Sequence, residues 1–139
     1  MGATACCIDL RITERGADVT YSNAGHPEVV LIGPEVDRLY TPGMYLGFFP
    51  GIAYDETGCR LERGDTLLVY SDGATELPNG EGAMLGVERL AEMMRDALSN
   101  GVEVQAALDA VVTTLTTYRG SAPAPDDITL LLLRIAKRD

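Results

Sequence analysis

The chain has 139 residues, of which 21 are acidic and 11 basic, so its formal net charge is −10. This length suits one domain with a single core. The charge argues against nonspecific binding to nucleic acid or to an anionic membrane. No apolar run approaches the roughly 18 residues that span a bilayer, and the first residues lack the basic segment of a signal peptide. We therefore expect a cytoplasmic protein with no membrane insertion in this segment and no nucleic-acid partner.

Three cysteines, Cys6, Cys7 and Cys59, occur without the spacing of a disulfide framework or a zinc site. Free cysteines in a reducing compartment commonly behave as small apolar residues. We expect all three to be buried thiols.

The first half of the chain reads as short strands separated by turns at roughly ten-residue spacing, which is typical of an antiparallel meander. The expected strands are residues 4–12, 18–24, 28–32, 36–40, 54–61 and 66–71. Residues 41–51 are rich in Gly and Pro and read as a loop. Its apolar side chains are expected to pack onto the domain; they are Met44, Leu46, Phe48 and Phe49.

The second half changes to helical spacing. Apolar residues recur every three or four positions in two stretches, which predicts amphipathic helices at about 86–99 and 102–119. A final apolar run predicts a strand at 127–135. Strands followed by two helices and a returning strand indicate an α+β fold with the helices layered on one face of the sheet.

Two acidic clusters stand at the ends of the most apolar strands, which we expect to be central. The first strand runs directly into Ser71-Asp72-Gly73, and the last begins just after Asp126-Asp127. If the two strands are neighbours, their carboxylates meet at one rim of a sheet. Crowded carboxylates are the oxygen ligands that Mg²⁺ or Mn²⁺ prefers. The pair of clusters therefore predicts a divalent-cation site.

Each cluster also has a local explanation. Asp-Gly is a common turn dipeptide, and an Asp pair before a strand can bond its own backbone. Gly73 is not followed by a mirrored strand, however, so a hairpin explains this Asp-Gly poorly. Taken together, the two clusters favour the metal site.

Five segments resemble one family in order and spacing. They are residues 21–27 (YSNAGHP), 46–47 (LG), 62–65 (ERGD), 70–76 (YSDGATE) and 126–130 (DDITL). Together they resemble the bacterial PPM-type, protein phosphatase 2C-like serine/threonine phosphatases, within which the stage II sporulation protein E and sigma-factor regulatory class is most similar. The resemblance implies an α-β-β-α fold, an antiparallel β-sandwich with flanking helices.

The resemblance also implies a chemistry. A binuclear Mn²⁺ or Mg²⁺ site activates a water molecule, so no side-chain nucleophile is required. The implied substrate is a phosphorylated regulatory protein of the anti-sigma-factor-antagonist type. By motif, the metal-site residues are Asp72, Gly73, Asp126 and Asp127.

Two further residues have two interpretations each. The single histidine, His26, could act as a general acid, but we favour a role in ordering its loop through a backbone hydrogen bond. Glu76 lies four residues after Asp72. It either supports the metal site from nearby or is simply an exposed acid, and both interpretations stay open.

One departure from the family pattern affects the functional prediction. The family domain begins upstream of residue 1, and its upstream part carries an Asp-Gly motif that bridges the two metals. Neither Asp9 nor Asp18 matches that motif. Residues 1–139 are therefore expected to form a single but partial phosphatase domain, with its N-terminal part missing.

Two functions follow from this expectation: a metal-dependent protein phosphatase, or a truncated, catalytically inactive binding module. An exposed sheet edge near residues 4–12 would also favour a homodimer, through that strand or through the helical face.

Overall fold

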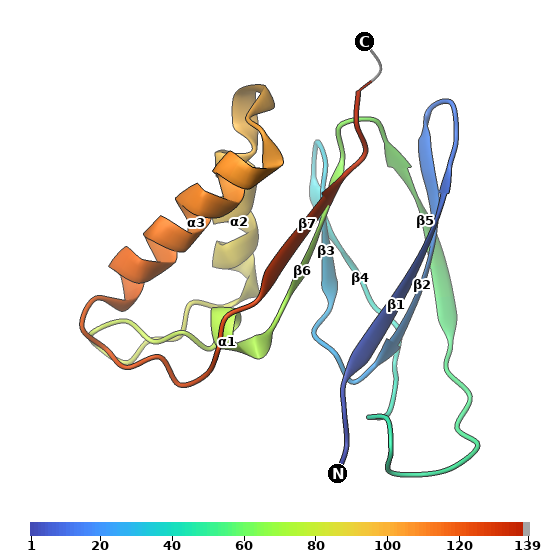
Figure 1. The fold of residues 1–139 in the computed structure, drawn as a ribbon, viewed down its shortest axis with the longest axis horizontal. Helices are drawn as coiled ribbons and strands as arrows, with labels where there is room; N and C mark the ends of the chain where they lie inside the picture. Colours follow the sequence, from blue (N-terminus) through green and yellow to red (C-terminus); the bar gives the residue numbers. More distant parts are fainter. Residues whose placement is uncertain (138–139) are drawn as a thin grey trace. The chain divides into compact units, whose positions relative to one another are not determined.

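The computed structural model describes residues 1–137, which contain seven strands, three α-helices and one short 3-10 turn (Figure 1). The chain divides into two compact units. The first comprises Met1–Leu67 with the segment that starts at Arg134, and the second comprises Leu68–Leu133. Among residues 1–137, no helix combines the length and apolar character that crossing a bilayer requires.

A three-stranded antiparallel sheet forms most of the first unit. Its order is β1-β2-β5, built from Ala5–Ile12, Gly16–Ala24 and Glu56–Glu62. The turn between β1 and β2 is shorter than expected, because Gly16 and Ala17 already pair with β5. The buried side chains of β2 alternate with partly exposed ones, as in a strand with one face toward a core. The antiparallel meander predicted for this half is confirmed.

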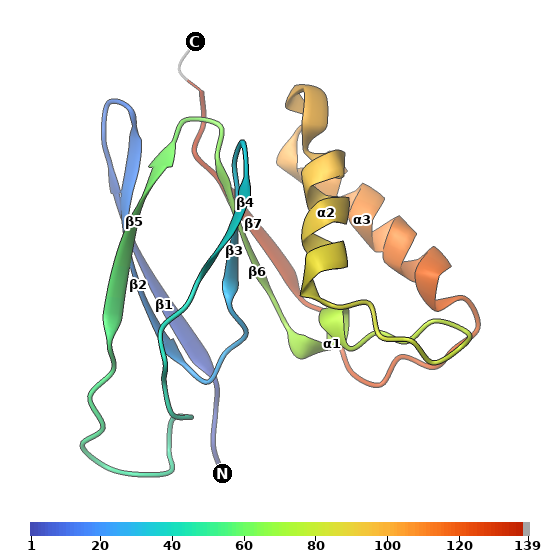
Figure 2. The ribbon, with the colours of Figure 1, turned by 180° about the vertical axis from the view of Figure 1, so that it is seen from behind.

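An antiparallel hairpin, β3 (Val29–Ile32) with β4 (Val36–Leu39), completes the first unit (Figures 1 and 2). Apolar side chains from both layers are almost fully buried and form the core of this unit: Ala17, Val19, Tyr21, Val29, Val30, Ile32, Leu39, Leu61 and Leu67.

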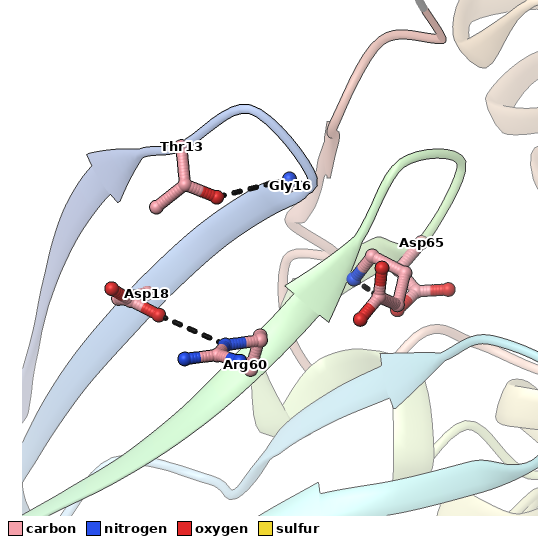
Figure 3. Close-up of polar contacts among 6 residues, drawn as sticks. Thr13, Gly16, Asp18, Arg60 and Asp65 are labelled. Atoms are coloured by element: carbon pink, nitrogen blue, oxygen red, sulfur yellow. Dashed lines mark hydrogen bonds and ion pairs between the residues drawn. The ribbon is translucent and has the colours of Figure 1, made fainter.

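Polar contacts hold the turn end of the first unit together. Arg63 donates three hydrogen bonds to main-chain carbonyls: Nε to Glu14, Nη2 to Thr13 and Nη1 to Ala136, each at 2.9 Å. Beside this clamp, Thr13 Oγ1 accepts a hydrogen bond from the Gly16 amide at 3.1 Å (Figure 3). The clamp therefore fixes the turn between β1 and β2.

The loop at 41–51 does not pack as expected. Its apolar side chains are largely exposed, with Phe48 at 59% and Phe49 at 63%. Their contacts are to one another and to the N-terminal segment: the Tyr45 and Phe48 ring centroids are 6.1 Å apart, and Leu46 pairs with Ala3. The prediction that this loop buries its apolar residues was wrong.

Helices supply most of the second unit. They are α1 (Asp72–Thr75), α2 (Val87–Ala97) and α3 (Val104–Arg119), and the two long ones match the predicted helices. Asn100 and Gly101 separate α2 from α3 with positive φ values of 59° and 74°, the conformation that ends helices. Both long helices bury apolar side chains: Leu90, Ala91 and Met94 of α2, and Ala107, Val111 and Leu115 of α3.

The second sheet has the hydrogen-bonding order β4-β3-β6-β7, where β6 is Thr66–Tyr70 and β7 is Leu130–Arg134. The prediction of a central strand is confirmed for β6, which is almost entirely buried. It was wrong for β7, which is an edge strand, as β4 is, and leaves Leu131 exposed. Strand β7 also begins three residues later than expected, so Asp127 precedes it in an irregular segment.

Candidate metal site

Ser71 connects the two acidic segments. Its amide donates to the Thr129 carbonyl at 3.0 Å, and its hydroxyl accepts from the Thr129 amide at 2.9 Å. The same hydroxyl donates to the Asp127 carbonyl at 3.2 Å. Three hydrogen bonds from one residue therefore hold the end of β6 against the chain that enters β7. The predicted metal site required the two strands to be neighbours, but the sequence did not single out Ser71 as the residue that joins them.

Gly73 allows these segments to touch. A Cβ atom at this position would lie 2.2 Å from the Asp127 carbonyl oxygen and 3.3 Å from that of Asp126. No side chain other than hydrogen fits at such distances, so the glycine of the Asp-Gly motif is required by close backbone approach. Gly73 is buried here.

The structure places all four predicted metal-site residues on these two touching segments. Asp72 occupies the first turn of α1, which begins directly after Ser71, and Asp126 and Asp127 lie just before β7. All three aspartates are exposed to solvent. Asp126 also bonds its own backbone, which was the alternative explanation for the Asp pair: its Oδ1 accepts a hydrogen bond from the Asp127 amide at 2.7 Å. Its second oxygen can still act as a ligand, since a carboxylate has several acceptor positions.

The donor set suits a hard divalent cation but is small. Exposed carboxylates on a backbone held by hydrogen bonds are the ligands that Mg²⁺ and Mn²⁺ take. Within residues 1–137, no group of three or more His, Cys, Asp or Glu side chains is gathered as a metal site. Asp72 and Asp126 are the carboxylates of the two motifs that could contact such an ion, with water or phosphate oxygens as its other ligands.

Glu76 follows α1 and is exposed. Its amide donates to the Asp72 carbonyl at 2.8 Å, which closes the single turn of α1. Its backbone therefore helps to orient the segment that carries Asp72, while its own carboxylate faces solvent.

The loop around His26, in the first unit, is ordered by a different residue from the one expected. Asn23, 4% exposed, accepts from the His26 amide at 2.7 Å and donates to the His26 carbonyl at 2.7 Å. The His26 ring instead contacts the Thr4 hydroxyl, with 3.3 Å between Nδ1 and Oγ1. The asparagine side chain reproduces the hydrogen bonds of a turn, so it, and not the imidazole, orders the backbone.

The three cysteines are free and lie on β1 and β5 of the first unit. The prediction of burial was wrong for Cys7, which is exposed, whereas Cys6 and Cys59 are half-buried. Burial raises the pKa of the Cys6 thiol, and the neighbouring Cys7 adds to this. Burial also raises the pKa of Cys59, with further contributions from Asp37 and Asp65.

Solved structures of known proteins share this fold. The phosphatase 2C domain of SiaA from Pseudomonas aeruginosa is 28% identical with a TM-score of 0.73, over 85% of this chain and 46% of that one. The RsbU and RsbW domains of Rv1364c from Mycobacterium tuberculosis are 25% identical with a TM-score of 0.71, over 96% and 36%. The Mn-presoaked phosphatase domain of SpoIIE from Bacillus subtilis is 18% identical with a TM-score of 0.68, over 97% and 58%. The chain therefore has the α+β fold of phosphatase 2C-like domains.

The family follows from the sequence model of Stage II sporulation protein E, which matches residues 1–136. The chain belongs to this SpoIIE family of phosphatase 2C-like domains, as the motifs predicted. Among curated proteins, IcfG from Synechocystis is 27% identical over 116 residues, which are 82% of this chain and 18% of IcfG. The chain spans less than half of the SiaA domain and under a fifth of IcfG.

Proposed function

We propose that this chain forms part of a metal-dependent phosphatase that hydrolyses phosphoserine or phosphothreonine on a regulatory protein. Asp72 and Asp126 would hold Mn²⁺ or Mg²⁺, with Asp127 and the Gly73 backbone beside them. When bound, such an ion supplies a nucleophilic water and neutralises phosphate charge. The role of the chain itself is to hold these oxygen donors in place and exposed to the substrate.

One observation carries this proposal: the close approach of Gly73 to the Asp127 carbonyl, at 2.2 Å from a Cβ position. A turn with only a local role would not need this contact between segments more than fifty residues apart. Membership of the SpoIIE family supports the same chemistry. The motif resemblance further suggests a regulatory phosphoprotein of the anti-sigma-factor-antagonist type as the substrate, and a cytoplasmic enzyme.

A second function is favoured by a specific finding. Because residues 1–137 bring together no group of three metal-ligating side chains, the chain could keep the fold and bind a partner without catalysing hydrolysis. Two-metal hydrolysis places the ions about 3.5–4 Å apart and needs ligands for both. The two functions therefore differ in the number of ions that the chain can hold.

Manganese binding tests the proposed site directly. We expect the chain to bind one Mn²⁺. Binding is measured as the decrease of the free-ion signal in electron paramagnetic resonance. Asp72→Asn and Asp126→Asn should each weaken binding by about tenfold or more, because ligand charge sets the affinity of such sites. Asp96→Asn, at an exposed position on α2, is the matched control. Equal affinity in all four proteins would refute the site.

Hydrolysis separates the two functions. For these 139 residues alone we expect little Mn²⁺-dependent release of phosphate from p-nitrophenyl phosphate or a phosphoserine peptide, since the described residues offer ligands for one ion only. Robust hydrolysis that a chelator abolishes would exclude the binding-module alternative. In a longer phosphatase that contains this segment, the same two substitutions should lower kcat by orders of magnitude.

A further inference from the structure

A small apolar hollow lies in the second unit between α3 and the segments that follow Asp72 and Asp126. Its volume is about 130 Å³, and it is lined by Leu77, Val112, Leu115, Thr116, Arg119 and Ile128. Leu77 and Leu115 are almost fully buried and form its floor, whereas Val112 and Ile128 are 51% and 37% exposed at its rim. Apolar cavities of about 150 Å³ hold molecules the size of benzene, so this hollow suits one branched or aromatic side chain.

The hollow also contains an unsatisfied cationic donor. Arg119 ends α3, and its Nε is buried with no hydrogen-bond partner among the described residues. Leaving a buried donor without a partner is costly, so such a group in a native fold calls for a missing partner. The natural partner of a guanidinium is a carboxylate or phosphate, which it contacts through two parallel hydrogen bonds.

Two residues that line the hollow lie close in the chain to the residues of the proposed metal site. Ile128 follows Asp126 by two residues, and Leu77 directly follows Glu76. An extended chain covers at most about 7 Å in two residues. A bound peptide covers the same distance in two residues, so a residue one or two positions from the phosphorylated one would reach the hollow.

We propose that this hollow binds an apolar side chain of the phosphoprotein substrate, within about two residues of the phosphorylated serine or threonine, and that Arg119 pairs with a carboxylate of the same segment. This inference rests on the proposed phosphatase function and extends it to substrate recognition. The occupant matches the hollow in size, apolar character and charge.

N-acetyl-leucine is a suitable probe, because it combines a branched side chain with a carboxylate. In methyl nuclear magnetic resonance spectra of the full chain, it should cause saturable shifts at Val112, Leu115 and Ile128. N-acetyl-leucinamide, which lacks the carboxylate, should bind about tenfold more weakly, equivalent to about 1.4 kcal/mol. N-acetylglycine should cause no shifts in the same range. Absence of saturable shifts with N-acetyl-leucine would overturn the proposal.

Three variants sharpen this test. Val112→Trp fills the hollow and should reduce binding of N-acetyl-leucine at least about tenfold, whereas Thr113→Trp, on the same helix but outside the hollow, should leave it unchanged. Arg119→Gln should remove the advantage of N-acetyl-leucine over its amide. Equal binding by Val112→Trp and the unmodified chain, or full competition by inorganic phosphate, would overturn the assignment.

A phosphoserine peptide that carries Leu-Glu after the phosphoserine distinguishes failure of this inference from failure of the proposed function. We expect its binding in Mn²⁺ to depend on both Asp72 and Val112. Binding that ignores Asp72→Asn refutes the metal-dependent function. Binding that requires Asp72 but ignores Val112→Trp refutes the hollow as a substrate site.

Discussion

Two groups of polar side chains, one in each compact unit, are used in opposite ways. In the first unit, Arg63 and Asn23 direct their polar atoms to main-chain groups, and Asp65 accepts from the Glu62 amide at 2.8 Å (Figure 3). In the second unit, Asp72 and Asp127 present exposed carboxylates, while their backbone is held by other residues. A polar side chain bonded within the fold serves structure, whereas an acid left exposed on a fixed backbone remains available to a ligand.

The largest effect should come from removing the close contact in the second unit. Gly73→Ala would place a methyl group 2.2 Å from the Asp127 carbonyl oxygen, so one of the two segments must move. We expect a loss of about 3 kcal/mol in the free energy of unfolding, measured by urea denaturation, because large losses arise where backbone cannot adjust. Mn²⁺ binding should be lost together with the contact.

Gly80→Ala is the control for this substitution, because no heavy atom lies within 4 Å of a Cβ at that position. Its effect should stay within about 0.5 kcal/mol. Equal stability and Mn²⁺ affinity for Gly73→Ala and Gly80→Ala would show that the close contact does not hold the site together.

A smaller effect should come from opening the clamp in the first unit. Arg63→Met removes three hydrogen bonds to carbonyls, and we expect a cost of about 2 kcal/mol, since bonds from charged donors contribute most. Arg60 offers a matched comparison: it pairs with Asp18 at 3.2 Å, but both side chains are largely exposed, at 66% and 44%. Arg60→Met should cost less than about 1 kcal/mol.

Urea denaturation of both arginine variants would measure this difference. If Arg60→Met lowered the free energy of unfolding as much as Arg63→Met, hydrogen bonds to the main chain would not mark the side chains that stabilise the fold. The contrast drawn above between bonded and exposed polar side chains would then be wrong. Mn²⁺ affinity should be unchanged in either variant, because neither side chain belongs to the acidic segments.

The smallest effect concerns thiol reactivity in the first unit. At pH 8, iodoacetamide should modify the exposed Cys7 before Cys59, whose lower exposure and raised pKa both reduce attack by the thiolate. The rate at Cys59 should keep rising as the pH passes 9.0, the ordinary thiol pKa. Peptide mass spectrometry after timed quenching measures each site. Faster labelling of Cys59 than of Cys7 would contradict the burial assigned to β5.

Features that depend on a pattern of only a few neighbouring residues could be predicted from the sequence. The spacing of apolar residues predicted both long helices and the strands of the meander, because each face of such an element must meet a core. The acidic clusters were also visible, since Asp72 and Asp126 each lie within two residues of an apolar run. The pattern of the two clusters favoured a metal site over a turn, and the family resemblance then added the two-metal phosphatase chemistry.

Sequence reasoning failed where neighbours from distant parts of the chain decide the outcome. The apolar loop at 41–51 was expected to be buried, but few other residues cover it. His26 attracted attention as the single histidine, yet Asn23 makes the bonds that order its loop. The chemical type of a residue does not reveal which side chain will find hydrogen-bond partners close to it in the folded chain.

The sequence by itself determined the α+β class and the two acidic segments, because these depend on local periodicity and on residue type. Only the tertiary structure decided that Gly73 touches the Asp127 backbone, that Ser71 joins the two segments and that Arg119 faces an apolar hollow. Each of these depends on distances between residues far apart in the chain, and such distances are set by how the strands and helices pack.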